Sequence, residues 1–240
     1  MFESELNHWW DKARRRIVFG LIKKYSRSSD VRPKILDLGC GMGAIAQEAQ
    51  KIGDYYGVDV SEKAVNFCKR RGIENVKQGD ALHVPYEDDQ FDIVLLLDTI
   101  EHVEDDFGVM DEVRRVLRPQ GMVIVTAPAF KFLWGPSDVT FQHFRRYRLG
   151  ELKARLERKD FSIIKSSYFN FFLFLPIFLG KMAVKYLRLP ISENEVSRQG
   201  INGIWIINKI LYYIFYTESM LLKYIDFPFG VSAMVIGRKR

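Results

Sequence analysis

Short apolar runs alternate with amphipathic segments from Lys34 onwards, and this alternation predicts strands separated by helices. The runs are rich in Val, Ile and Leu, which is typical of strands that are buried on both faces. The predicted strands are 34–38, 54–60, 75–80, 91–98, 122–128, 161–169 and 231–239, and the predicted helices between them are 43–52, 62–72, 106–121 and 149–159. This order predicts an α/β fold: a Rossmann-like, doubly wound, seven-stranded, mostly parallel sheet with helices on both faces.

Two further segments lie outside this alternation. Residues 8–25 have apolar positions at helical spacing, so we expect an amphipathic N-terminal helix that acts as a lid. A segment rich in aromatic residues, Ile and Leu separates the last two strands and is far longer than an ordinary connection. We therefore divide the chain into an N-terminal helix (1–30), a core (31–168 and 231–240) and a helical, apolar insertion (169–230).

Composition narrows the class of protein only slightly. A chain of 240 residues with a net charge of +6 suits one core domain with an insertion, and it is compatible with an anionic membrane surface, an anionic substrate or nucleic acid. Cys40 and Cys68 lack metal-ligand spacing, so we expect no metal, no disulfide and a reducing cytoplasm. The N-terminus lacks a signal-peptide pattern, and the longest apolar run, 171–180, is too short to span a bilayer.

A glycine-rich turn follows the first predicted strand, in the sequence LDLGCGMGAIA. Its glycines at 39, 41 and 43 let backbone N–H groups approach a ligand at the positive end of the next helix. Asp37 precedes the turn, where a carboxylate could meet a cationic ligand. Asp59 ends the second strand, where an acid accepts hydrogen bonds from a ribose. Asp80 ends the third strand, where an adenine amino group could be recognised. Dinucleotide-binding enzymes share a glycine turn of this kind and remain an alternative at this point.

Four stretches of the chain resemble the class I S-adenosylmethionine-dependent methyltransferases that modify small molecules: LDLGCGMG, GVDVSEKAV, QGDALHVPYEDDQFDIVLLLDTIEHVED and EVRRVLRPQGMVIVTAP. The resemblance covers residues 34–128, with the motifs in the family's order. It implies S-adenosylmethionine as cofactor and S-adenosylhomocysteine as product. A nicotinamide enzyme is disfavoured, because LDLGCGMG is not GxGxxG with a small residue at its close. The implied cofactor contacts are Asp37, Gly39, Cys40, Gly41, Gly43, Asp59, Val60, Asp80, Ala81, Leu82, Leu97 and Asp98.

The segment GPSDVTFQHFRRYRLGEL, residues 135–152, leaves the same edge of the sheet after the fifth strand. It resembles a stretch found in methyltransferases of glycan and lipid-linked sugar pathways. His143 could take a proton from a hydroxyl, and arginines offer forked donors for phosphate or carboxylate. A solvated surface loop is the alternative. The candidate catalytic residues are His143, Asp138 and His102, although His102 could instead cap the following helix; the candidate acceptor contacts are Arg145, Arg146, Tyr147, Trp9 and Trp10.

The apolar insertion has two open interpretations. Lys181, Lys185 and Arg188 recur at helical spacing beside Phe- and Leu-rich positions, which is typical of a surface that contacts an anionic membrane or a lipid tail. A buried helical cap explains the same composition. If residues 169–222 face lipid, we expect a peripheral contact at the cytoplasmic face of the membrane.

These observations together predict an O-methyltransferase that acts on a small-molecule or lipid-linked acceptor, amphipathic and glycolipid or isoprenoid-like. The second hypothesis is a methyltransferase of RNA or protein. Nucleic acid is disfavoured by the modest net charge and by the lack of an appended RNA-binding module. The third hypothesis is a non-catalytic scaffold that keeps the cofactor-binding fold. It is disfavoured by the intact glycine turn and by the intact acidic residues of the cofactor motifs. The oligomeric state stays open.

Overall fold

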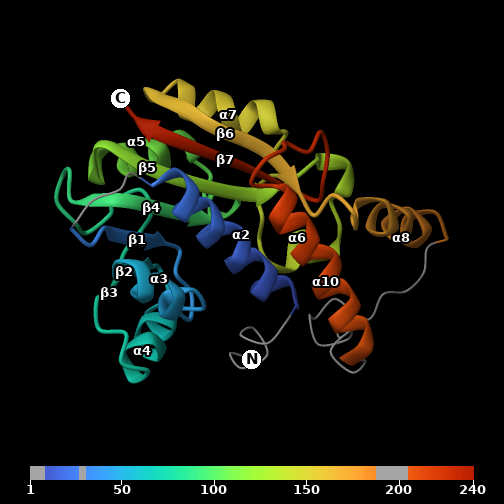
Figure 1. Ribbon diagram of the computed structural model, residues 1–240, viewed down its shortest axis with the longest axis horizontal. Helices are drawn as coiled ribbons and strands as arrows, with labels where there is room; N and C mark the ends of the chain where they lie inside the picture. The colour runs from blue at the N-terminus through green and yellow to red at the C-terminus, as the bar shows by residue number, and fades with distance from the viewer. Residues whose placement is uncertain (1–8, 27–30, 188–204) are drawn as a thin grey trace.

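A seven-stranded sheet forms the centre of the fold, in the order β3-β2-β1-β4-β5-β7-β6 (Figure 1). β7 pairs antiparallel with β5 and β6, and the other neighbours pair in parallel. The predicted doubly wound, mostly parallel sheet is therefore confirmed. The strands are β1 (Lys34–Leu38), β2 (Asp54–Asp59), β3 (Val76–Gln78), β4 (Phe91–Leu97), β5 (Leu117–Pro128), β6 (Phe161–Phe169) and β7 (Ser232–Lys239).

The computed structural model describes residues 9–26, 31–187 and 205–240, with side chains at 10–26, 31–182 and 209–240. The side chains of Trp9, Lys185 and Arg188, to which roles were assigned above, lie outside this part. The described helices are α2 (Trp9–Tyr25), α3 (Ala46–Ile52), α4 (Glu62–Arg70), α5 (Asp106–Val116), α6 (Pro136–Thr140), α7 (Leu149–Glu157), α8 (Phe174–Leu187) and α10 (Trp205–Leu221), with 3-10 turns η1 (Ile100–His102) and η2 (Lys131–Leu133).

Helices cover both faces of the sheet, because alternate strand residues point to opposite sides. Ile35, Ile93 and Leu95 pack in one cluster with α2, α3, α4 and α10. Leu36 and Val94 pack in the other with α5 and α7. Figure 1 shows α2 and α10 side by side across one face. The sheet therefore has no exposed face at its centre, as the apolar strands predict.

The boundary between α5 and β5 differs from the predicted one. The helix ends at Val116 rather than at 121, and Leu117 already pairs with Phe91 of β4. Pro119 lacks an N–H donor, so it cannot contribute to a continuing helix. β5 is consequently longer than expected. Two short elements after β5, η2 and α6, were not predicted as helices.

The predicted insertion, 169–230, does not form one separate cap. Phe215 and Leu222 are fully buried in the same cluster as α2, so α10 is part of a core layer. Trp10 stacks against Phe169 and Phe215, with ring centroids 6.1 and 5.2 Å away. The Trp10 ring therefore packs between β6 and α10, and its predicted contact with the acceptor stays a prediction. α8 instead projects from the side of the molecule (Figure 1).

The predicted basic stripe on α8 is not supported at Lys181. Its ammonium donates a hydrogen bond to the backbone oxygen of Leu133, which ties α8 to η2. Burial, with the neighbouring Arg146 charge, lowers the pKa of Lys181 to about 8. This side chain is thus turned toward the protein, away from an anionic leaflet.

Candidate active site

A cavity of about 910 Å³ opens at the carboxyl ends of β1, β2 and β4. Ligands of open parallel sheets bind at this edge, because the loops after the strands converge there. One end of the cavity is lined by the glycine turn and by the ends of β2 and β3. The other end is lined by η1 and by the segment after α6, through His102, Gln142, His143 and Phe144. Two parts of the chain with different chemistry therefore meet in one space.

The glycine turn is held by backbone hydrogen bonds to the end of β2. Gly39 and Cys40 donate their N–H groups to the Val58 oxygen at 2.8 and 3.0 Å. The Asp59 carboxylate accepts the N–H groups of Gly41 (2.7 Å) and Ser61 (2.9 Å). Because those bonds fix its orientation, Asp59 borders the cavity as a pre-positioned acceptor for hydroxyl groups.

Glycine is required in this turn for two different reasons. Gly39 has φ +83, and a Cβ there would lie 2.4 Å from the Thr99 hydroxyl oxygen. Gly41 has φ +53, and a Cβ there would meet nothing within 4 Å. The first glycine thus permits packing against Thr99, in the turn that follows β4. The second leaves open space beside Asp59 into which a ligand fits.

Most predicted cofactor residues lie at this cavity. Seven of them line it directly: Gly39, Asp59, Val60, Asp80, Ala81, Leu82 and Asp98. Cys40 and Gly41 border an adjoining cavity of about 610 Å³ between the glycine turn, α2 and α4. The lining residues that sequence reasoning missed include Thr99, Gln142 and Phe144, which lie in loops without a motif.

Three predicted contacts, Asp37, Gly43 and Leu97, do not line either cavity. Asp37 is buried and accepts a hydrogen bond from the Tyr55 hydroxyl at 3.0 Å. Burial raises the pKa of Asp37 to about 7, although Tyr55 and the Arg14 charge act against the rise. A Cβ at Gly43 would lie 2.8 Å from Ile73 Cδ1, so this glycine serves close packing. All three residues are buried in this structure, and their contacts with the cofactor stay predictions.

An arginine of α2 reaches the site that the motifs define. Arg14 Nη1 lies 2.6 Å from Asp98 Oδ2, and Asp98 also accepts a hydrogen bond from the Thr126 hydroxyl at 3.1 Å. This ion pair attaches α2, the helix that was predicted to act as a lid, to the end of β4. Arg14 belongs to a run of three arginines, so its role is difficult to recognise from the sequence alone.

Asp138 is the centre of a buried hydrogen-bond network under the second end of the cavity. Its carboxylate accepts two bonds from Arg146 (2.7 and 3.0 Å), one from the Gly135 N–H (2.7 Å) and a contact of 2.9 Å from His143 Nδ1. Burial acts to raise the pKa of Asp138, but the Arg146 bonds and charge bring it below its usual value. Asp138 is therefore ionised and orients His143, and it does not itself reach the cavity.

The three predicted acceptor contacts in this segment have partners inside the protein. Arg146 is 7% exposed and is used by Asp138 and the Ala129 oxygen. Arg145 pairs with Asp106 at 3.0 Å, and the Tyr147 hydroxyl donates to Asp106 at 2.9 Å. None of the three lines the cavity. In this structure the three side chains support the loop, and their predicted contact with an anionic group of the acceptor stays a prediction.

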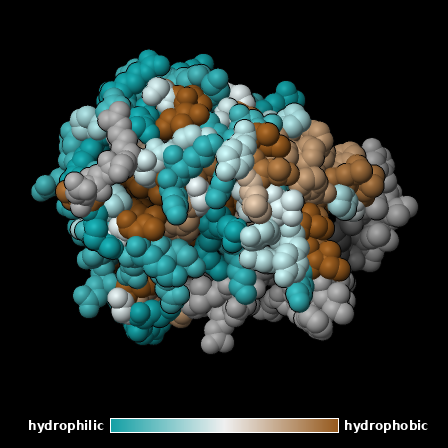
Figure 2. All heavy atoms as spheres, in the orientation of Figure 1, coloured by the Kyte–Doolittle hydropathy of each residue, from teal (hydrophilic) through white to brown (hydrophobic). Residues whose placement is uncertain are grey.

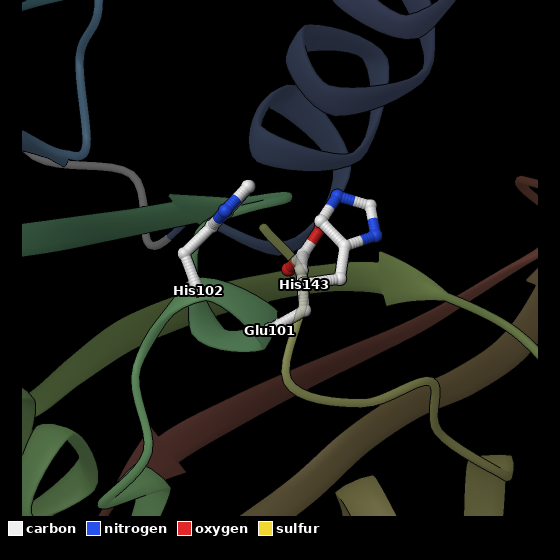
Figure 3. Close-up of side chains that lie close together, drawn as sticks. All are labelled: Glu101, His102 and His143. Carbon is white, nitrogen blue, oxygen red and sulfur yellow. The ribbon is translucent and has the colours of Figure 1, made fainter. Parts of the chain in front are cut away.

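His102 and His143 do reach the cavity, and Glu101 lies beside them (Figure 3). The two imidazole rings meet edge to face at a centroid distance of 4.7 Å. Burial and the nearby His143 lower the pKa of His102. His102 does not cap α5, because Asp105 accepts the Gly108 N–H at 2.9 Å in that position. Two roles were considered for His102, a catalytic one and that of a helix cap. Its position at the cavity favours the catalytic role.

Glu101 was not singled out from the sequence. It is 1% exposed, and burial raises its pKa well above the usual value, with the Asp98 charge acting in the same direction. Its position next to a histidine in DTIEHVED is the feature of the sequence that could have marked it as a site residue. Its burial depends on packing that only the fold reveals.

The mouth of the cavity is aromatic. Phe144 lines the cavity and is 56% exposed, and Phe141 lies nearby, stacked on His143 at 6.2 Å. Further exposed apolar side chains gather on and around α8, where Figure 2 shows a hydrophobic surface. None of the described helices is long and apolar enough to cross a bilayer.

Comparison with known proteins agrees with this geometry. Residues 36–125 match the family described as a methyltransferase domain. A demethylmenaquinone methyltransferase of Staphylococcus aureus is 32% identical in an alignment of 152 positions that covers 58% of this chain and 61% of that protein. The chain thus matches less than two thirds of the length of these curated relatives.

Solved structures share the fold. A methyltransferase dependent on S-adenosylmethionine from Archaeoglobus fulgidus has a TM-score of 0.58 at 21% identity, over 95% of this chain and 97% of that one. The cyclase SpnF has a TM-score of 0.61 at 19% identity, over 96% and 83%. In its motifs, its sheet order and these matches, the chain is similar to class I S-adenosylmethionine-dependent methyltransferases. The acceptor does not follow from the fold, which a cyclase also adopts.

Proposed function

We propose that the protein transfers a methyl group from S-adenosylmethionine to a hydroxyl oxygen of an amphipathic small molecule, glycolipid or isoprenoid-like. One observation carries this proposal. A single cavity has Asp59 and the glycine turn at one end and His102, His143 and Phe144 at the other. When bound, the cofactor supplies an electrophilic methyl group on a positively charged sulfur.

The residues present at the first end fit this cofactor. Asp59 is held by two backbone N–H groups and can accept hydrogen bonds from ribose hydroxyls. Val60, Ala81 and Leu82 offer apolar surface for an adenine ring, with Asp80 beside them. The open space at Gly41 suits the methionine part.

The residues at the second end suit a hydroxyl. With Nδ1 of His143 directed at the ionised Asp138, its Nε2 presents a lone pair for the hydroxyl proton. This pairing is the arrangement by which a buried carboxylate orients a basic imidazole. Phe144 gives the acceptor's apolar part a contact at the mouth. A quinone-type ring is a second acceptor class, favoured by the relative named demethylmenaquinone methyltransferase.

The same proposal includes a peripheral contact with the cytoplasmic face of a membrane. Its support is the exposed apolar set on and around α8: Phe132, Phe172, Leu175 and Leu179. Because Lys181 is turned inward, we expect flotation with neutral and anionic vesicles alike. A Leu175→Ser/Leu179→Ser double variant should lose flotation. Flotation of this variant equal to that of the wild type contradicts the contact.

Incubation with labelled cofactor tests the acceptor class. Cell extract is divided into lipid, small polar, protein and nucleic acid pools, and we expect the label in the lipid pool. His143→Gln should lower incorporation about 100-fold, within the usual range for loss of a general base, while His83→Gln, a change at an exposed histidine outside the cavity, should not. Label in the nucleic acid or protein pool would favour the second hypothesis. Cofactor binding without any labelled pool would favour a scaffold.

A further inference from the structure

Three side chains with metal-binding atoms converge at the second end of the cavity. Glu101 and His102 belong to η1, and His143 lies in the loop after α6. One ligand atom from each lies within 4.8 Å of the other two. Figure 3 shows Glu101 and His143 close together, with His102 across from them. Segments some forty positions apart in sequence thus bring two imidazoles and a carboxylate together.

The His143 imidazole is oriented as a metal ligand usually is. A histidine that binds a metal through one ring nitrogen commonly gives the other to a carboxylate or a backbone oxygen. His143 Nδ1 contacts the Asp138 carboxylate at 2.9 Å, which leaves the lone pair of Nε2 available. The His102 ring meets the His143 ring edge to face at a centroid distance of 4.7 Å, so it lies beside the same place.

The third side chain supplies an independent sign of a ligand. Glu101 is 1% exposed, and its Oε2 has no hydrogen-bond partner in the part of the chain that the structure describes. Leaving a buried polar atom without a partner is unfavourable, because the atom has lost its hydrogen bonds to water. A cation between Glu101 and the two imidazoles would give this oxygen a partner.

We propose that Glu101, His102 and His143 bind a divalent transition-metal ion, for which Zn²⁺ is the best match. Two imidazole nitrogens and one carboxylate oxygen are a ligand set that catalytic zinc sites use, with a fourth position left open. Hard cations such as Mg²⁺ prefer oxygen ligands and fit less well. The open position would face the cavity, because His102 and His143 both line it.

Binding needs a modest closure of the site. Ligand bonds of about 2.0–2.2 Å in a tetrahedral site place neighbouring ligand atoms about 3.3–3.6 Å apart. In this structure the ligand atoms of the three side chains lie within 4.8 Å of one another, so they must move closer together. His102 is exposed and can move inward. Glu101 and His143 are held by burial and by Asp138, so they form the fixed side of the site.

This inference rests on the proposed function and specifies how the acceptor is held. The hydroxyl oxygen of the acceptor would take the open position on the ion, which lowers the pKa of that hydroxyl. Its O–H bond breaks, the oxygen keeps the electron pair, and the proton passes to water. With the ion bound, the His143 lone pair coordinates it, so the ion replaces His143 in the general-base role proposed above.

Calorimetric titration of the full chain with Zn²⁺, after treatment with a chelator, tests the site. We expect one ion per chain with a micromolar or lower dissociation constant. Glu101→Gln should weaken binding at least 50-fold. His83→Gln, which changes a histidine outside the cluster, should bind as the wild type does and so controls for surface histidines.

S-adenosylhomocysteine is titrated in parallel, so that the metal and the cofactor are judged separately. Unchanged cofactor binding by Glu101→Gln shows that this variant folds. If it does not fold, His102→Ala, a change at an exposed side chain, replaces it with the same expected loss of Zn²⁺. Wild-type protein that binds S-adenosylhomocysteine but no Zn²⁺ overturns the metal site alone, as does equal Zn²⁺ binding by the variant. Failure to bind S-adenosylhomocysteine overturns the proposed function whatever Zn²⁺ does.

Discussion

The two ends of the cavity use their polar groups in different ways. At the glycine turn, backbone N–H groups hold Asp59 so that its carboxylate stays available to a ligand. At the other end, Asp138 and Arg146 bind each other below the surface, and His143 is what they present to the cavity. Cofactor affinity should thus depend on one pre-positioned acid, whereas the acceptor end should depend on a buried ion pair that touches no ligand.

The largest expected effect is on folding, from the ion pair at the acceptor end. Arg146→Ala leaves the Asp138 carboxylate buried without its main partner. Breaking a buried pair in this way costs about 3–5 kcal/mol. We expect urea unfolding to show a loss of this size, whereas Arg148→Ala, at an exposed neighbouring position, should change stability by less than about 0.5 kcal/mol. Equal midpoints for the two variants would show that the pair is not a scaffold.

At the cofactor end, the main effect should be on binding rather than on folding. Asp59→Ala removes the acceptor for a ribose and frees the Gly41 N–H, so we expect about 100-fold weaker binding of S-adenosylhomocysteine, or about 2.7 kcal/mol. Asp54→Ala, at the exposed start of the same strand, is the matched control and should bind normally. Calorimetry checks both variants. Normal binding by Asp59→Ala would remove the contrast between the two ends.

A buried carboxyl of α10 should make the stability of the protein depend on pH. Glu218 accepts hydrogen bonds from the backbone N–H groups of Asn170, Phe171 and Phe172, just before α8. Burial raises the pKa of Glu218 to about 7 from a usual 4.5. The folded state therefore holds this proton more tightly than the unfolded state. Its contribution to stability is complete below about pH 4.5 and is lost as the pH rises through about 7.

Glu218→Gln isolates that contribution, because glutamine does not titrate. Between pH 5 and pH 8, the wild type should lose about 2 kcal/mol of unfolding free energy relative to the variant. Urea unfolding at both pH values measures the difference. If the difference in unfolding free energy between the wild type and the variant is the same at both pH values, Glu218 titrates equally in the folded and the unfolded state.

The smallest expected effect concerns the mouth of the cavity. Phe144→Ala removes exposed apolar surface next to His143, so we expect KM for the acceptor to rise about tenfold with kcat and cofactor binding little changed. Tyr224→Ala, a highly exposed aromatic outside the cavity, should leave KM unchanged. Steady-state kinetics with the labelled acceptor separates the two constants. A fall in kcat alone would place Phe144 in the chemistry instead of in acceptor binding.

The same contrast explains how much the sequence could predict. Asp59 and Gly39 follow predicted strands directly, and the carboxyl ends of parallel strands meet at one edge, so local patterns suffice there. The spacing of Asp138 and Arg146 in the sequence is compatible both with a site that binds an anionic group and with a buried ion pair. Only their burial and mutual bonds decide between the two.

Long-range packing accounts for the other differences. The composition of the segment before β7 fits a cap and a core helix alike, and Phe215 becomes core only because α10 lies against α2. Arg14 reaches Asp98 across 84 positions, and Lys181 reaches Leu133 across 48. Such pairs leave no periodic signal in the sequence.

A crystal structure of the protein with S-adenosylhomocysteine would show directly whether the cavity holds the cofactor as proposed. We expect the ligand in the cavity of about 910 Å³, with its ribose hydroxyls on Asp59, its adenine beside Asp80 and its sulfur directed toward the end that holds His102 and His143. A ligand bound with its ribose away from Asp59, or with its sulfur directed away from the two histidines, would contradict this proposal.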